Sequence, residues 1–231
     1  MQIVKHNAAY KISRAAGILL LLSLLVPILN WGLVLSNFIS PGIETSLTIL
    51  DDELLFRLNI FTGIFSAIII LALNICLYRM LCKVNRSLAL FAFSLKMTEA
   101  ILAAILFIGH FVALLILKGE PENTDVQGII NQLVGNYISL TVISGVFFGS
   151  SMLIYSYLFL KSGYVHLIVA LSGIISYSLV IIYDSMAILF PCYAGILSIK
   201  LLGSVPVSLS KYYLGCGFHL KELKQDNIHK K

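Results

Sequence analysis

The chain has 231 residues, of which 59% are hydrophobic and only 12% are charged, and its formal net charge is +5. Soluble domains carry about 25% charged residues, so this composition excludes an ordinary soluble domain and indicates a membrane protein. The basic residues are spread over several short connections instead of forming one patch, so we expect no nucleic-acid partner.

Six apolar stretches predict an all-α polytopic helix bundle, as a single integral membrane domain over residues 1–231. The first is too long for the ~7–15-residue core of a signal peptide, so we expect it to be retained, and Pro27 should kink it. The last is the weakest, because it contains Lys200 and Pro206. The predicted transmembrane helices cover residues 15–39, 58–77, 88–117, 137–160, 167–190 and 193–209.

Other features of the chain support smaller expectations. Residues 126–136 are mildly amphipathic and predict a short interfacial helix. Gly145 and Gly149 form a G-x-x-x-G pattern, which permits the close approach of another helix. Arg57 follows an acidic connection, so we expect an interfacial anchor or a partner for that loop. Four cysteines lack the spacing of a metal site or a disulfide framework, so we expect free thiols, no metal and no cofactor: Cys76, Cys82, Cys192 and Cys216.

Lys and Arg alternate between the two sides that these helices define. Twelve of the 16 lie on one side, while Arg57 and Lys118 lie on the other side with seven carboxylates. This positive-inside bias predicts six helices with both termini in the cytoplasm and a basic cytoplasmic tail over residues 211–231. The twelve residues are Lys5, Lys11, Arg14, Arg79, Lys83, Arg86, Lys161, Lys211, Lys221, Lys224, Lys230 and Lys231.

Charged and histidine side chains within the predicted helices form our candidate intramembrane polar site, namely Lys96, Glu99, His110, Asp184 and Lys200. Lys96 and Glu99 are three residues apart, so they can pair within one helix. Asp184 and Lys200 are each eight residues from Cys192 at a hairpin tip, so they should lie at matching depth and pair. We expect the first pair nearer the cytoplasmic side, and His110 nearer the outer side with Asp184 and Lys200.

Two interpretations of these side chains remain open at this stage. An unpaired charge at the centre of a membrane helix costs about 2.5–3.5 kcal/mol, so each charge needs a partner or water. In the first interpretation the groups are structural pairs that fix the helices relative to one another. In the second they line a path for a solute or for protons, because ionisable residues inside a membrane are functional candidates by default.

Several segments carry a resemblance to a known family. They are LLFRL at 54–58, LCKVNRSLAL at 81–90, Lys96, Glu99-Ala100, FFG at 147–149, LKSGY at 160–164 and YDS at 183–185. The chain resembles, from Ala16 to Asp184, the uncharacterised multi-pass prokaryotic membrane proteins known as domain of unknown function 4386, with little to match beyond Pro191. The family tends to have Arg at the position of Lys96, and Pro-Arg at that of Val165-His166. The resemblance implies a six-helix membrane protein of a prokaryotic plasma membrane and supplies no activity.

Three function classes remain. We expect a non-catalytic integral membrane protein with an envelope or partner-subunit role, whose partners are the lipid bilayer and a second membrane protein or a second copy. The alternative is a small-solute or proton-coupled transporter or channel that uses the candidate polar site. A membrane-embedded enzyme is the third class, but the sequence contains no H-E-x-x-H, G-x-S-x-G, C-x-x-C or P-loop motif, so we predict no catalytic residues.

Overall fold

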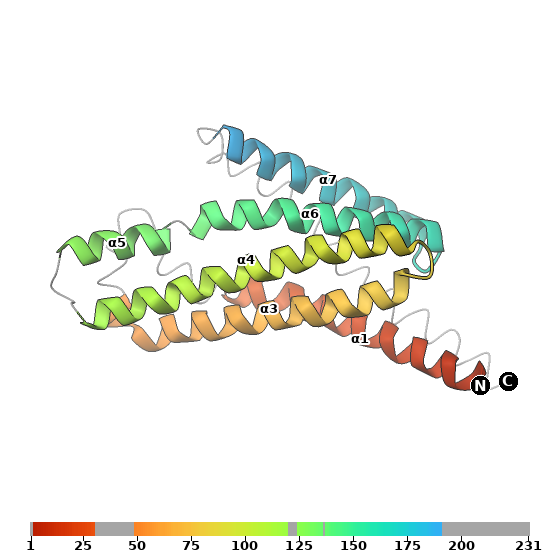
Figure 1. Cartoon of the computed structure of the whole chain (residues 1–231), viewed down its shortest axis with the longest axis horizontal. Coiled ribbons are helices and arrows are strands. Elements are labelled where there is room, and N and C mark those ends of the chain that lie inside the picture. Colours follow the sequence, from red (N-terminus) through yellow and green to blue (C-terminus); the bar gives the residue numbers. More distant parts are fainter. Residues whose placement is uncertain (1, 31–48, 120–123, 136, 191–231) are drawn as a thin grey trace.

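The structure, a computed structural model, describes residues 2–30, 49–119, 124–135 and 137–190. These residues form an elongated bundle of helices that run roughly along one axis (Figure 1). No strand occurs in these four ranges. The helices are α1 (Gln2–Leu29), α3 (Glu53–Leu81), α4 (Arg86–Gly119), α5 (Thr124–Gly135), α6 (Tyr137–Ser162) and α7 (Leu167–Leu189).

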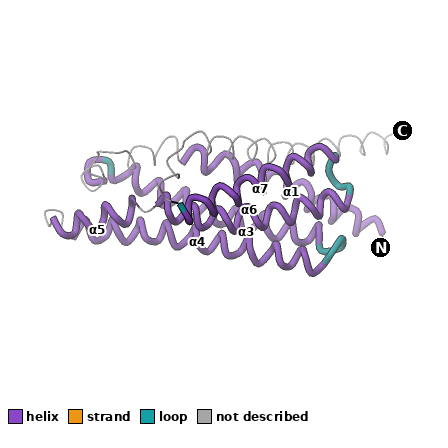
Figure 2. The backbone as a smooth tube through the Cα atoms, turned by 90° about the horizontal axis from the view of Figure 1, so that it is seen from above, coloured by secondary structure: helices purple, strands orange, loops and turns teal. Residues whose placement is uncertain are grey.

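The long helices pack in a simple neighbour order. Contacts between elements are most numerous for α6 with α7, α4 with α6, α3 with α4 and α1 with α3, so the bundle is the row α1–α3–α4–α6–α7. The turn between α3 and α4 and the turn between α6 and α7 lie at the same end (Figure 2). We call this the basic end, because Arg79, Lys83, Arg86 and Lys161 are exposed there. The opposite end, with Asp51, Asp52 and Glu53, is the acidic end.

Local chemistry explains why the helices begin and end at these turns. The Asn85 side chain accepts a hydrogen bond from the Leu88 backbone N–H (3.1 Å), as a helix N-cap does. Gly163 ends α6 with a φ of 63°, a left-handed conformation in which glycine avoids the steric cost of a Cβ. His166, where the family tends to have Arg, caps α7 by accepting from the Ile168 backbone N–H (3.4 Å).

Five of the described helices have the length and apolarity to cross a membrane: α1 from Ile12, α3, α4, α6 from Leu140, and α7. This outcome confirms five of the predicted spans, with the second and third extended at both ends. Large apolar side chains such as Phe61, Ile68, Ile108 and Ile175 are exposed along the bundle, which suits contact with lipid. The predicted sixth helix, its Lys200 and the basic tail lie outside the described residues, as do residues 31–39 of the first.

Two apolar cores occupy the two halves of the bundle. On α4 the core of the basic half ends at Ala92 and the core of the acidic half begins at Ala113, and the three buried ionisable side chains of α4 lie between them. The first core consists of Leu20, Leu73, Leu77, Leu81, Ala89, Ala92, Met152, Tyr155, Leu158, Phe159 and Tyr177. The second consists of Ile49, Phe56, Ile60, Ala113, Leu114, Leu117, Ile130 and Val134.

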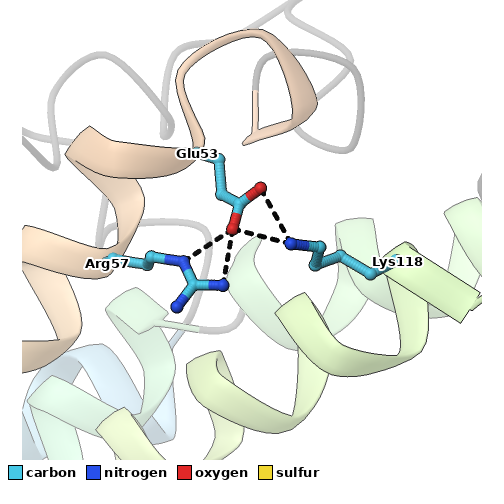
Figure 3. Close-up of polar contacts among 3 residues, drawn as sticks. All are labelled: Glu53, Arg57 and Lys118. Carbon is cyan, nitrogen blue, oxygen red and sulfur yellow. Dashed lines mark hydrogen bonds and ion pairs between the residues drawn. The ribbon is translucent and has the colours of Figure 1, made fainter.

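The short helix α5 closes the acidic half of the bundle. The structure has a helix over Thr124–Gly135, which confirms a short helix in the predicted region, and Ile130 and Val134 pack into the second core. Figure 1 shows α5 beside the last part of α4 and beyond the start of α6. This helix therefore lies at the acidic end of the bundle. An exposed ion cluster joins the helix ends here: Glu53 contacts Arg57 (2.6 Å) and Lys118 (2.9 Å) (Figure 3). Arg57 thus pairs with a carboxylate at the acidic end of the bundle.

The G-x-x-x-G pattern of α6 is used for close packing against α7. A Cβ built on Gly149 would lie 2.8 Å from Ile181 Cγ1 and 3.3 Å from the Tyr177 backbone oxygen. A Cβ built on Gly145 would collide with the Asp184 carboxylate. Both glycines therefore allow α7 to approach the α6 backbone more closely than any other residue would permit.

Candidate functional site

Lys96 and Glu99 form an ion pair in the interior of the bundle. Their side chains are 2% and 9% exposed, and Lys96 Nζ lies 2.7 Å from Glu99 Oε2. The ammonium group also lies 4.5 Å from the centre of the Phe148 ring of α6, within the range of a cation–π interaction. The predicted i, i+3 pair is therefore confirmed, and the α6 ring provides a second contact that the sequence did not indicate.

A pocket of about 240 Å³ opens onto this pair. Its wall combines the two charged side chains with three hydroxyl-bearing residues and several apolar groups: Ser23, Pro27, Ile70, Lys96, Glu99, Thr141, Ser144, Gly145 and Phe148. Glu99 Oε2, the oxygen that contacts Lys96 Nζ, is itself fully buried, so the pocket meets other atoms of the pair.

Asp184 of α7 lies behind the pocket wall. It is 8% exposed, and it packs against Gly145, which itself lines the pocket. Asp184 therefore contacts a residue of the pocket wall without being part of that wall itself.

Helix rise gives the approximate position of each ionisable side chain along the bundle. Measured from the basic end at ~1.5 Å per residue, Glu99 is about 20 Å along α4 and Asp184 about 26 Å along α7, whereas His110 is about 36 Å along α4. The sequence expectation placed Asp184 by its separation of eight residues from Cys192 at the opposite hairpin tip. In the structure α4 extends well beyond the end of α7 (Figure 1). Lys200, the predicted partner of Asp184, lies outside the described residues.

His110 belongs to a second polar cluster nearer the acidic end. Asn59 Nδ2 of α3 lies 3.2 Å from His110 Nδ1, and Asn30 Nδ2 donates to Asn59 Oδ1 at 3.1 Å. Thr62 Oγ1 donates to Asn30 Oδ1 at 2.9 Å. Because Asn59 Oδ1 already accepts from Asn30, the Asn59 amide nitrogen faces His110 and donates to His110 Nδ1. These hydrogen bonds link α4, α3 and α1. The rings of Phe56 and Phe107 lie 5.7 and 5.6 Å from the imidazole.

Asparagine side chains make further hydrogen bonds between the helices. Asn30 and Asn74 make interhelical hydrogen bonds, the role that such residues usually have in membrane helices. Asn74 donates to the Phe93 backbone oxygen (3.0 Å) and accepts from the Tyr155 hydroxyl (2.7 Å). Asn59, the centre of the His110 cluster, was not singled out. Its signal was present, because it lies 15 residues before Asn74 on the same helix, close to a whole number of helical turns.

Metal binding has no support among the described residues, which contain no group of three or more His, Cys, Asp or Glu side chains suited to one ion. Cys76 and Cys82 are free, half-buried thiols, and the other two cysteines lie outside the described residues.

Comparison with known proteins identifies the family. A search of curated proteins and a search of solved structures found no match. A family model, described as "Domain of unknown function (DUF4386)", matches residues 15–216. This range confirms the resemblance inferred from the sequence and corrects its extent, since the match continues beyond Pro191, where the sequence comparison found little. The chain therefore belongs to the DUF4386 family of membrane proteins.

Proposed function

We propose that this chain is a non-catalytic integral membrane protein that binds a small polar solute in the Lys96–Glu99 pocket, as a small transporter or channel does. The observation that carries the proposal is the pocket itself, which is lined by both members of a buried ion pair and by three hydroxyl-bearing residues. A volume of about 240 Å³ is below the ~300–1,000 Å³ of pockets for drug-sized ligands, so the solute is smaller than a drug-sized molecule.

The alternative of a purely structural pair predicts a different environment. Charges inside a membrane bundle are costly, and a pair that serves only to hold helices together is most stable when it is closely packed and fully hydrogen-bonded. Here open space and the hydroxyl-bearing Ser23, Thr141 and Ser144 adjoin the pair. These groups provide the polar lining that a bound solute or water needs.

A second candidate function, a subunit or envelope protein without a ligand, is favoured by one contact. Lys96 already has two favourable partners, the Glu99 carboxylate and the Phe148 ring, and demands no ligand of its own. Under this candidate the pair would set the rotation of α4 against α6, and a membrane-protein partner or a second copy would complete the assembly.

We further propose that the protein spans a prokaryotic plasma membrane six times, with the basic end and both termini in the cytoplasm. The exposed cations of the basic end and the carboxylates of the acidic end support this orientation through the positive-inside rule. An impermeant thiol reagent, applied to intact cells that carry a cysteine at Lys83 or at Asp51, should label only the second.

The ligand need not be known in order to test the pocket. In a variant with Cys76, Cys82, Cys192 and Cys216 replaced by Ala, a Ser144→Cys substitution places a thiol in the pocket. Thiols react as thiolates, which require water, so a small methanethiosulfonate should label this cysteine in proteoliposomes. The matched control, an Ile105→Cys variant, carries its thiol at a position 53% exposed on the apolar outer surface, and it should stay unlabelled. Labelling of the Ser144→Cys thiol only after denaturation would contradict a hydrated binding pocket.

A further inference from the structure

We infer that the turn between α3 and α4 is a binding site for an anionic phospholipid. The lipid phosphate lies among Arg79, Lys83 and Arg86, and the acyl chains lie on the apolar surface next to these cations. The site is at the basic end of the bundle, away from the Lys96–Glu99 pocket, so it adds a second ligand to the proposed solute and does not depend on that proposal.

The three cations belong to one short connection. Arg79 is in the last turn of α3, Lys83 lies in the turn itself, and Arg86 is the first residue of α4, and all three are exposed. The turn is held by its own backbone, since the Leu81 carbonyl oxygen accepts a hydrogen bond from the Asn85 N–H at 3.4 Å. The cations therefore extend from a backbone that is already ordered, which lowers the entropic cost of binding an anion.

The positive charge of this turn is not compensated within the described residues. None of its three cations forms an ion pair there. The described carboxylates lie at the acidic end or inside the bundle, and at the acidic end both Arg57 and Lys118 contact Glu53. Charge complementarity at the basic end therefore favours an anionic partner that the described residues do not supply.

Exposed apolar side chains adjoin the cations on the side toward the middle of the bundle. Ile75 lies four residues before Arg79 on α3, and Leu90 lies four residues after Arg86 on α4, so each shares a helix face with its cation. Both are about 6 Å deeper along the bundle, and they are 50% and 54% exposed. Cations above exposed apolar side chains match the headgroup and the acyl chains of one lipid molecule.

The same arrangement recurs on α1, which packs against α3. Arg14 and Ile18 are four residues apart, and both are exposed. The N-terminal half of α1 lies toward the basic end (Figure 1), so Ile18 is again the deeper of the two. A free phosphate or a nucleic acid would use only the cations, whereas a phospholipid uses both levels, and this distinction favours the lipid.

The number of cations gives the size of the preference. Each Lys or Arg near an anionic membrane surface changes an equilibrium constant about fivefold. Two cations that share one phosphate would give about 25-fold, and salt screening lowers this value. We expect the site to prefer an anionic over a zwitterionic phospholipid about tenfold.

The test measures lipid contacts by tryptophan fluorescence, with the whole chain in bilayers. In a Trp31→Phe background, which has no other tryptophan, Leu90→Trp places a fluorophore one helical turn from Arg86. The bilayers mix dioleoylphosphatidylglycerol, an anion, with zwitterionic dioleoylphosphatidylcholine, and one of the two carries brominated chains, which quench a tryptophan in contact with them. Exchanging the brominated lipid gives the relative binding constant, which we expect to favour phosphatidylglycerol about tenfold. The matched control, Leu115→Trp, is on the same helix with the same 54% exposure but near the acidic end, and its ratio should be near one.

Variants of the Leu90→Trp protein separate a local site from the general charge of the basic end. Arg79→Gln and Arg86→Gln should each lower the preference about fivefold, and Arg86→Lys should keep most of it. Lys161→Gln, which removes a cation from the α6–α7 turn at the same end, should leave it unchanged. A ratio near one in the Leu90→Trp protein, or equal losses from Arg86→Gln and Lys161→Gln, would overturn the inference.

Inorganic phosphate distinguishes the lipid from a soluble anion. At an ionic strength matched with potassium chloride, phosphate should not reduce the preference for phosphatidylglycerol. A loss that is specific to phosphate would show that the turn binds a free phosphate, and it would also overturn the inference. Cysteine labelling of the Ser144→Cys pocket is independent of each of these results, so a failure here leaves the proposed function standing.

Discussion

Removing one partner of the buried ion pair should destabilise the protein far more than removing both. Glu99→Gln leaves the Lys96 ammonium, only 2% exposed, with the Phe148 ring as its remaining favourable contact. At 2.7 Å and an effective dielectric constant of about 20, the lost attraction is about 6 kcal/mol. Part of it is offset because the carboxylate no longer has to be desolvated, and broken buried pairs typically cost 3–5 kcal/mol. We expect Glu99→Gln to lower the free energy of unfolding by about 3 kcal/mol.

The second substitution supplies the control. Lys96→Met in the Glu99→Gln background removes the unpaired ammonium and fills its volume with an apolar chain, so stability should return to within about 1 kcal/mol of the parent. Denaturant titration in lipid–detergent micelles, followed by circular dichroism, measures the four proteins of this double-mutant cycle. Additive effects of the two single substitutions, with a coupling energy below about 0.5 kcal/mol, would refute the view that the two charges stabilise each other.

Three further predictions concern packing and surface charge, all measured by the same titration. Tyr155→Phe removes the hydroxyl that donates at 2.7 Å to a buried amide of α3 and should cost about 1–3 kcal/mol, whereas Tyr157→Phe, at a position 46% exposed, should cost almost nothing. Gly149→Ala should lower the free energy of unfolding by about 1–3 kcal/mol, because an added Cβ would collide with α7. Gly109→Ala is the control, because an added Cβ there meets no atom within 4 Å, and it should be neutral or slightly stabilising through helix propensity. Equal effects of the two substitutions would contradict the packing argument. Lys118→Ala should cause no measurable change at physiological salt, because its ion pair with a half-exposed carboxylate is screened by solvent, and a large loss would show that this cluster holds the acidic end together.

The architecture was predictable because each span is a long apolar run, and its ends are set by local residues. Arg86 and Lys118 mark the ends of α4 to within a residue or two, and Gly163 ends α6. The i, i+3 pair was predictable for the same reason, since the geometry of one helix fixes both side chains. The pocket and the contact between Asp184 and Gly145 were not, because they depend on how far α7 slides along α6. Sequence periodicity gives the face on which a residue lies but not that displacement.

The position of each polar cluster along the bundle decides its electrostatic cost in a membrane. The hydrocarbon core of a bilayer is about 30 Å thick, and α4, with 34 residues, is about 51 Å long. With the basic end at one headgroup layer, Glu99 and Asp184, at about 20 and 26 Å, lie within the hydrocarbon core. His110, at about 36 Å, would then lie at the opposite interface, where its hydrogen-bonded link to Asn59 has a low electrostatic cost. The ion pair at the more costly depth lines the pocket, whereas the histidine at the cheaper depth belongs to a hydrogen-bonded link between helices. A structural role accounts for the second cluster, and the proposed ligand binding would account for the cost of the first.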